Sequence, residues 1–151
     1  MTFLSTAPRD RANSALETAT RRLAFQERNA ATGWDLWTAP MERDDGGLRL
    51  GEPEIFLQNT LDEQNPSFPP DGRWLAYSST ESGLYQVYVR AFPDTGGKWQ
   101  VSSDAGRQPE WSRSSPELLF RSADNQIMAV TYRVKGDSFR NNGDACGRRG
   151  L

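Results

Sequence analysis

Short apolar runs recur along the chain at similar intervals. Leu23-Ala24-Phe25 lies 52 residues before Leu75-Ala76-Tyr77, which lies 43 residues before Leu118-Leu119-Phe120. Each run is apolar at consecutive positions, which predicts a strand with no face turned to solvent. A strand of this kind suits a sheet packed between two other sheets. Intervals of about 40 to 50 residues are typical of propeller blades.

A tight turn precedes the central run, at Pro69-Pro70-Asp71-Gly72. Proline presets φ, aspartate bonds its own backbone, and glycine accepts the positive φ that a reversal needs. The stretch 65–79 therefore predicts two antiparallel strands joined by this turn. In the third unit Ser114-Ser115-Pro116 replaces Asp71-Gly72-Arg73, so the turn is weaker there.

The same register predicts the other strands of each unit. Third strands are expected at 34–39, 85–90 and 125–130, each after turn-forming residues, and fourth strands at 54–58 and 98–102. The third unit shows no fourth strand. The predicted fold is all-β: a partial β-propeller of about three four-stranded antiparallel blades, the last incomplete, over 12–60, 64–103 and 107–139. Its expected core residues are Leu23, Phe25, Leu36, Leu75, Tyr77, Val87, Val89, Trp111, Leu118, Phe120 and Ile127.

The two ends carry weaker patterns. Residues 1–20 are expected to be a frayed terminus or a degenerate first strand. Ser14 and Glu17 have capping-box spacing for a short helix, but the repeat favours a strand over 14–22, with 13–16 as its link. Residues 140–151, rich in glycine and arginine, are expected to form a disordered tail. We expect no signal peptide and no membrane span, and the compartment stays open.

Composition adds limits on function. Aromatic residues make up 11% of the chain, which suits large rings packed between sheets. Trp74, Trp99 and Trp111 fall where such rings are needed, so we interpret them as core and not as a stacking platform for bases or sugars. Charges of both signs are interspersed and the net charge is −2, which weighs against nucleic-acid binding. Cys146 is the only cysteine, so no internal disulfide forms.

The residues that carry most enzyme chemistry are missing. The chain has no histidine, which excludes Ser-His-Asp and Cys-His systems and histidine metal sites. We interpret Asp44-Asp45 and Asp62-Glu63 as solvated loops, and Asp71 as a turn former. Gly46-Gly47 and Gly96-Gly97 lack the context of a phosphate-binding loop and are expected in hairpins. We therefore expect no catalytic residue, no metal and no cofactor.

The links into the first strands of units two and three are the candidate binding site. The innermost strand of each propeller blade lines the central channel, so its entrance lies at one mouth of that channel. The polar residues there are Gln64, Asn65, Arg107 and Gln108. They are candidates for contact with a protein or a small ligand, although they could equally cap the strands.

Two units resemble the TolB-like propeller family: SFPPDGRWLAYSS with LYQVYVRAF, and PEWSRSSPELLF with QIMAV. RLAFQERNAATGWDLWTAP resembles the latter part of another unit, and the resemblance covers Arg21 to Phe139. The central unit is most similar to propellers at the C-terminal end of bacterial serine/threonine protein kinases. The resemblance implies a non-catalytic sensor or regulatory module, since no kinase signature is present.

An alternative origin is the gating propeller of a prolyl-oligopeptidase-type serine peptidase, without its Gly-x-Ser-x-Gly hydrolase domain. Propellers of the TolB-like family usually close with about six blades. Three blades leave the outward faces of the first and third units uncovered, and the repeat makes both faces apolar. We expect a sticky, partly molten fragment with no stable partner, in preference to two copies that complete a six-bladed ring.

Overall fold

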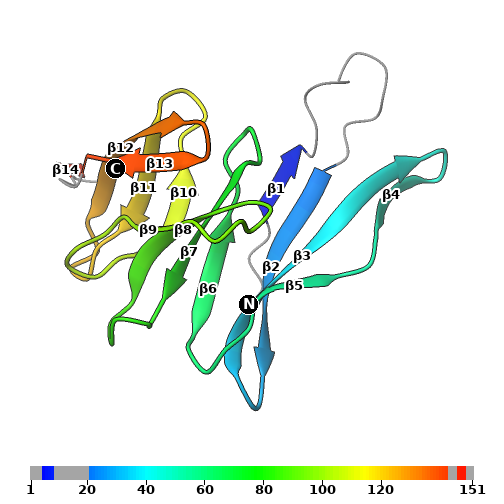
Figure 1. Ribbon diagram of the computed structural model, residues 1–151, viewed down its shortest axis with the longest axis horizontal. Coiled ribbons are helices and arrows are strands. Elements are labelled where there is room, and N and C mark those ends of the chain that lie inside the picture. Colours follow the sequence, from blue (N-terminus) through cyan, green and yellow to red (C-terminus); the bar gives the residue numbers. More distant parts are fainter. Residues whose placement is uncertain (1–4, 9–20, 143–145, 149–151) are drawn as a thin grey trace.

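The computed structural model shows three antiparallel sheets that follow one another in chain order (Figure 1). It describes residues 5–8, 21–142 and 146–148. All the regular elements among them are strands, which confirms the predicted all-β class with three blade-like units. We call these units blades 1, 2 and 3.

Each blade contains a meander of four strands, and blades 1 and 3 each have a fifth strand. Blade 1 has β1 (Ser5–Pro8), β2 (Arg21–Asn29), β3 (Gly33–Asp44) and β4 (Gly47–Leu50), and β5 (Glu54–Leu57) also pairs with β3. Blade 2 has β6 (Glu63–Ser67), β7 (Trp74–Ser79), β8 (Gln86–Ala91) and β9 (Lys98–Gln100). Blade 3 has β10 (Arg107–Trp111), β11 (Glu117–Arg121), β12 (Ile127–Lys135) and β13 (Ser138–Asn141), and β14 (Cys146–Arg148) also pairs with β12.

The Pro-Pro-Asp-Gly turn forms as its residue types predict. Gly72 has a φ of 68° and its N–H donates to the Pro69 carbonyl at 3.0 Å. The Asp71 carboxylate accepts the backbone N–H of Arg73 at 3.1 Å. β6 and β7 are therefore reversed onto each other, and the turn leads directly into the most buried strand of blade 2.

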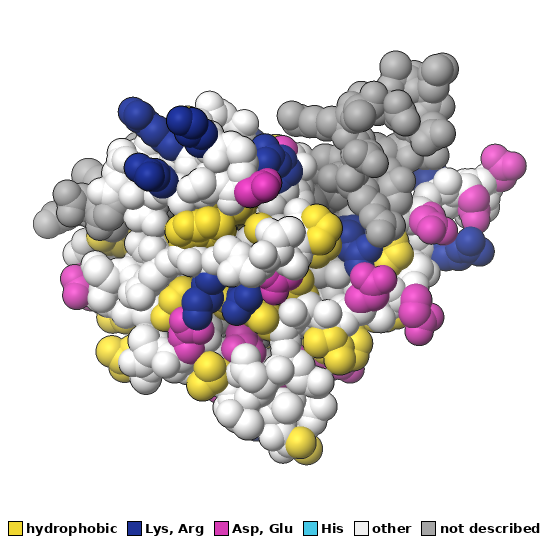
Figure 2. Space-filling model, viewed as in Figure 1, with side chains coloured by type: hydrophobic (Ala, Val, Ile, Leu, Met, Phe, Trp, Pro, Cys, Tyr) yellow, Lys and Arg dark blue, Asp and Glu magenta, His cyan; other side chains and the backbone are white. Residues whose placement is uncertain are grey.

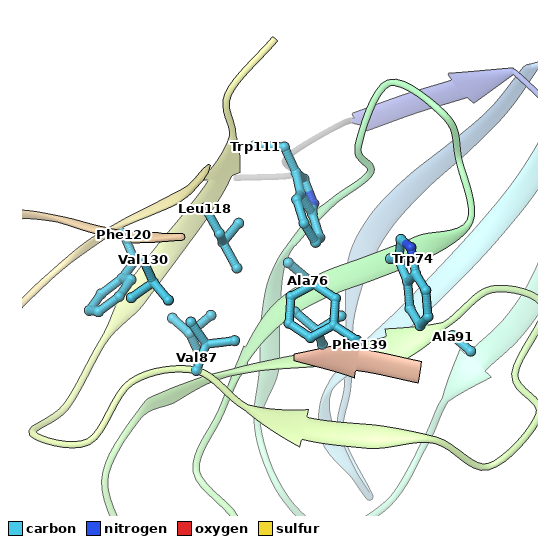
Figure 3. Close-up of a cluster of buried hydrophobic side chains, with 11 residues drawn as sticks. Trp74, Ala76, Val87, Ala91, Trp111, Leu118, Phe120, Val130 and Phe139 are labelled. Atoms are coloured by element: carbon cyan, nitrogen blue, oxygen red, sulfur yellow. The ribbon is translucent and has the colours of Figure 1, made fainter. Parts of the chain in front are cut away.

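Blade 2 is buried on both faces, which explains its continuous apolar run. In β7, Trp74 and Ala76 face blade 3, whereas Leu75 and Tyr77 face blade 1. The side chains between blades 2 and 3 form one cluster (Figure 3). Two smaller clusters join blades 1 and 2, one around Ala24 and Leu75 and one around Leu36 and Tyr77. Neighbouring sheets thus supply the core that no single sheet could bury.

Nine of the eleven expected core residues are buried. The exceptions are Phe25, which is half-buried, and Ile127, which is 37% exposed. The equivalent residues of blade 2, Tyr77 for Phe25 and Val87 for Ile127, are both buried because another blade covers them. Phe25 faces outward from blade 1 and Ile127 outward from blade 3, where no further blade covers them.

The expectation that the third unit lacks a fourth strand is wrong. β13 pairs with the C-terminal half of β12, from Tyr132↔Asn141 to Lys135↔Ser138. Its Phe139 is 1% exposed because the ring packs against Trp74 of blade 2, with ring centroids 5.5 Å apart. This strand has one aromatic residue among polar ones, so its sequence lacks the alternating pattern that predicts a strand.

The chain ends form strands where they are described, which agrees with the first-strand alternative for 1–20 and differs from the disordered tail expected at 140–151. β1 pairs with β2, from Ser5↔Ala24 to Pro8↔Arg21, and forms the first strand of blade 1. The link or helix expected at 13–16 and most of 14–22 lie outside the described residues. Of the expected disordered tail, 140–141 belong to β13 and Cys146–Arg148 pair with β12. Gly46-Gly47 lie at the tip of a hairpin, as expected, but the second strand of that hairpin, β4, was not predicted; it pairs with the end of β3.

Candidate functional site

Two left-handed backbone positions mark the start of blades 2 and 3. Asn65 in β6 and Gln108 in β10 both have a φ of 55°, and both lie where the pairing register shifts. They are 43 residues apart, so the same bulge recurs in each unit. A non-glycine residue in this region costs on the order of 1 kcal/mol or more, and surrounding contacts must hold it.

A hydrogen bond from the preceding blade holds each of these positions. The backbone N–H of Asn65 donates to the Gln26 side-chain oxygen at 2.7 Å, and that of Gln108 donates to the Ser78 hydroxyl at 3.1 Å. Gln26 and Ser78 directly follow the apolar runs of β2 and β7. Ser78 also donates to the Asn65 side-chain oxygen at 3.2 Å. We call the two bonds accepted by Gln26 and Ser78 the inter-blade bonds.

A more exposed group lies next to them. The Gln64 amide donates to the Tyr85 hydroxyl at 2.8 Å, and the Arg107 guanidinium carbon stands 3.7 Å from the Tyr85 ring centroid. Arg107 is exposed, whereas Gln64 and Tyr85 are half-buried. The backbone of Gly106 donates to the Tyr85 carbonyl at 2.8 Å, which fixes Arg107 beside the ring. We call Gln64, Tyr85 and Arg107 the Arg107 surface.

The structure therefore divides the four predicted site residues into two roles. Asn65 is 9% exposed and is held by the inter-blade bonds, as Gln108 is through its backbone. Gln64 and Arg107 present side chains at the surface with Tyr85, and the Gln108 side chain is exposed too. Sequence analysis missed Tyr85 because it opens a predicted strand, and no local motif relates it to a residue 22 positions away.

The Arg107 surface has the chemistry of an anion-binding group. A guanidinium stacked on a ring keeps its N–H edge available for a planar carboxylate, which it can bind with two parallel hydrogen bonds. The stacking also lowers the side-chain entropy lost on binding, because one side of the guanidinium plane is already packed. This group can therefore hold a carboxylate.

Glu63 corrects the expectation of a solvated Asp62-Glu63 loop. It is 2% exposed, and its carboxyl accepts the Asn59 amide at 2.9 Å. Burial, reinforced by nearby acids such as Asp35, raises its pKa from 4.5 to about 7. Asp62 is half-buried and accepts the Trp34 N–H at 3.1 Å, because the link between blades 1 and 2 passes the end of the β2–β3 hairpin.

The other acidic and glycine pairs lie in loops as expected. Asp44 and Asp45 are exposed at the β3–β4 hairpin, and Gly96 and Gly97 lie between β8 and β9. Within the described ranges, no three His, Cys, Asp or Glu side chains gather as metal ligands. The described part of the chain also contains no helix long and apolar enough to cross a membrane.

No protein-family model matches this chain, and no curated protein matches it.

Proposed function

We propose that this chain is a non-catalytic binding module of propeller-type blades that holds a carboxylate of a protein or small-molecule partner at the Arg107 surface. The observation that carries the proposal is the stacking of exposed Arg107 on Tyr85, with the Gln64 amide bonded to the same ring's hydroxyl. Two repeats contribute to one group, since Gln64 and Tyr85 come from blade 2 and Arg107 from blade 3.

The rest of the chain supports a binding role over an enzymatic one. The sequence has no histidine. The carboxyl whose pKa rises to about 7, that of Glu63, is 2% exposed and has no access to a substrate. The likeness of the repeats to TolB-like propellers supports a sensor or regulatory module, with the C-terminal propellers of bacterial serine/threonine kinases as its proposed relatives.

A titration monitored by NMR tests this function. The probe is a tetraglutamate peptide added to the isotope-labelled full chain, and we expect saturable shift changes centred on Gln64, Tyr85 and Arg107. Arg107→Gln should abolish these changes and leave the melting temperature unaltered. Arg28→Gln, which removes an exposed arginine from blade 1, is the matched control and should bind as the unaltered chain does.

Two results would overturn the proposal. One is a set of shift changes that is the same in Arg107→Gln and in the unaltered chain, or the absence of shift changes in the unaltered chain. The other is catalysis: we expect no ATP binding by calorimetry and no peptidase or kinase turnover. Saturable ATP binding, or turnover lost on substitution of one carboxylate, would contradict a non-catalytic module.

A further inference from the structure

The outward face of blade 1 is apolar. Ala24 and Leu36 pack against blade 2, so the residues that alternate with them point away from it. The register places Phe25 beside Trp37, Trp37 beside Ile55, and Met41 beside Leu50 on this side. Leu23 and Ala39 also lie on it, but they are 8% and 1% exposed and so are already covered. Leu50 is 55% exposed and Ile55 is 50% exposed. We call this surface, formed by Phe25, Trp37, Met41, Leu50 and Ile55, the blade 1 face.

The outward face of blade 3 is more polar than expected, because its apolar Leu119, Ala129 and Ile127 lie among charged residues. Leu118 and Phe120 pack against blade 2, so their neighbours in β11 point outward. The paired residues on this side are Glu110 with Leu119, Arg121 with Ile127, and Glu117 with Thr131. A repeat array ends in units whose outer side is polar, because that side stays in water.

Blade 3 also lacks the acceptor that links one blade to the next. Arg121 follows its apolar run, at the position of Gln26 in blade 1 and Ser78 in blade 2. Those two residues accept the backbone N–H of the following blade. A guanidinium has no acceptor atom, so Arg121 cannot form this bond. Two independent features thus make the outward face of blade 3 a poor surface for stacking of another blade.

We propose that the blade 1 face binds the same face of a second copy of this chain about a two-fold axis. A ring in which blade 1 meets blade 3 of the partner would bury Glu117 and Arg121 without the inter-blade bond. Contact between two blade 1 faces buries apolar surface from both copies and leaves both polar blade 3 faces in water. Such a contact is self-complementary, as a two-fold interface requires.

Charge complementarity fixes the orientation. Glu27 lies at one end of the blade 1 face, paired with Asp35, and Arg43 lies at the other end, paired with Leu48. Eight residues separate Asp35 from Arg43 along β3, or about 27 Å. A two-fold axis perpendicular to the strands reverses their direction. It therefore sets Glu27 opposite Arg43 of the partner subunit, and the same pair forms twice.

The β3–β4 hairpin is placed to take part in this contact. It extends away from the other sheets at the upper right of the ribbon (Figure 1). Charged side chains of both signs surround this end of the molecule (Figure 2). Leu48 and Leu50 are 58% and 55% exposed on it, flanked by Arg43 and Met41 across the hairpin. The polar surroundings align the copies, and the apolar residues supply the buried area.

Sedimentation equilibrium of the full chain tests the proposal. We expect a discrete dimer, and Ile55→Asp should give a monomer with an unchanged circular dichroism spectrum because Ile55 is half exposed. The matched control is Ile127→Asp, which places the same charge on the blade 3 face and should leave the dimer intact. Glu27→Arg and Arg43→Glu should each weaken dimerisation by about tenfold or more, and the double variant should restore it.

Three outcomes would overturn the proposal. An unaltered chain that stays monomeric at all concentrations, or that grows without limit, forms no two-fold dimer. A dimer that Ile127→Asp dissociates uses the blade 3 face and is a ring. A dimer that Ile55→Asp disrupts, but whose charge reversals are not restored in combination, has a different orientation.

Discussion

Tyr77 shows how single residues are fixed between blades. Its side chain is 1% exposed, its ring stacks on that of Tyr88 with centroids 6.0 Å apart, and its hydroxyl accepts the Arg90 N–H at 3.1 Å. Tyr77→Ala removes this ring from the contact between blades 1 and 2. We expect a loss of roughly 3 to 5 kcal/mol in unfolding free energy, measured in urea.

The control for Tyr77 is Leu84→Ala, since Leu84 is 66% exposed. It should change the unfolding free energy by less than about 0.5 kcal/mol. A Tyr77→Ala protein that melts within a degree or two of the unaltered chain would show that the register is wrong.

Glu63 makes stability depend on pH. Its pKa rises to about 7 in the folded chain because of burial, whereas an unfolded carboxyl titrates near 4.5. Between these values the unfolded chain has released a proton that folded Glu63 keeps, so stability falls as pH rises through this range. Glu63→Gln removes the cost of ionising a buried carboxyl. At pH 8 the unfolding free energy of the variant should therefore exceed that of the unaltered chain, by no more than about 3 kcal/mol.

The advantage of Glu63→Gln should disappear near pH 4, where the carboxyl is protonated in both states. Glu52→Gln, at an exposed carboxyl, is the control and should show no such trend. An advantage of Glu63→Gln that is the same at pH 4 and pH 8 would mean that Glu63 titrates normally.

At the residue scale, sequence reasoning succeeds where neighbours in the repeat share one environment. Leu75 and Val87 were predicted core because their equivalents are apolar, and both are fully buried. It fails for Ile127, whose equivalent Val87 is covered by another blade while Ile127 is not. It fails also for Glu63, because no property of an acidic pair reveals which other segment packs over it.

At the element scale, the inter-blade bonds recur with the repeat. Ser78 is fully buried, and its hydroxyl accepts the Gln108 N–H and donates to Asn65. Ser78→Ala should destabilise the chain by roughly 1 to 2 kcal/mol, because it removes a hydrogen bond and leaves a polar group without its partner. Hydrogen exchange of the Gln108 amide should become faster, while the Asn65 amide, held by Gln26, should keep its protection. If the Gln108 amide exchanged at the same rate in Ser78→Ala and in the unaltered chain, the Ser78 hydroxyl would not protect it.

Turn chemistry and apolar runs predicted the elements well, and terminal strands poorly. The turn before β7 and the third strands of all three blades follow from residue types alone. The strands β13 and β4 did not, since polar residues surround their few apolar ones. The left-handed conformations of Asn65 and Gln108 were also unpredicted, because neither is a glycine.

At the scale of the whole molecule, the sequence predicted three stacked blades. The sequence could not show which of the two end faces is more apolar, because that depends on which side of each strand faces the next blade. Only the observed alternation shows that Glu117 and Arg121 point outward from blade 3, and that Phe25 and Trp37 point outward from blade 1. The grouping of Tyr85 with Arg107 likewise depends on two blades packing together.

The three sheets pack face to face in this register, and nuclear Overhauser effects between blades test this packing. We expect contacts between the rings of Trp74 and Phe139, whose centroids are 5.5 Å apart, and between Ala24 and Leu75. Contacts within blade 2, such as those between the paired Ala76 and Val89, serve as the internal reference. If these appeared while both inter-blade contacts were missing, the sheets would form without stacking, and the Arg107 surface would not exist as described.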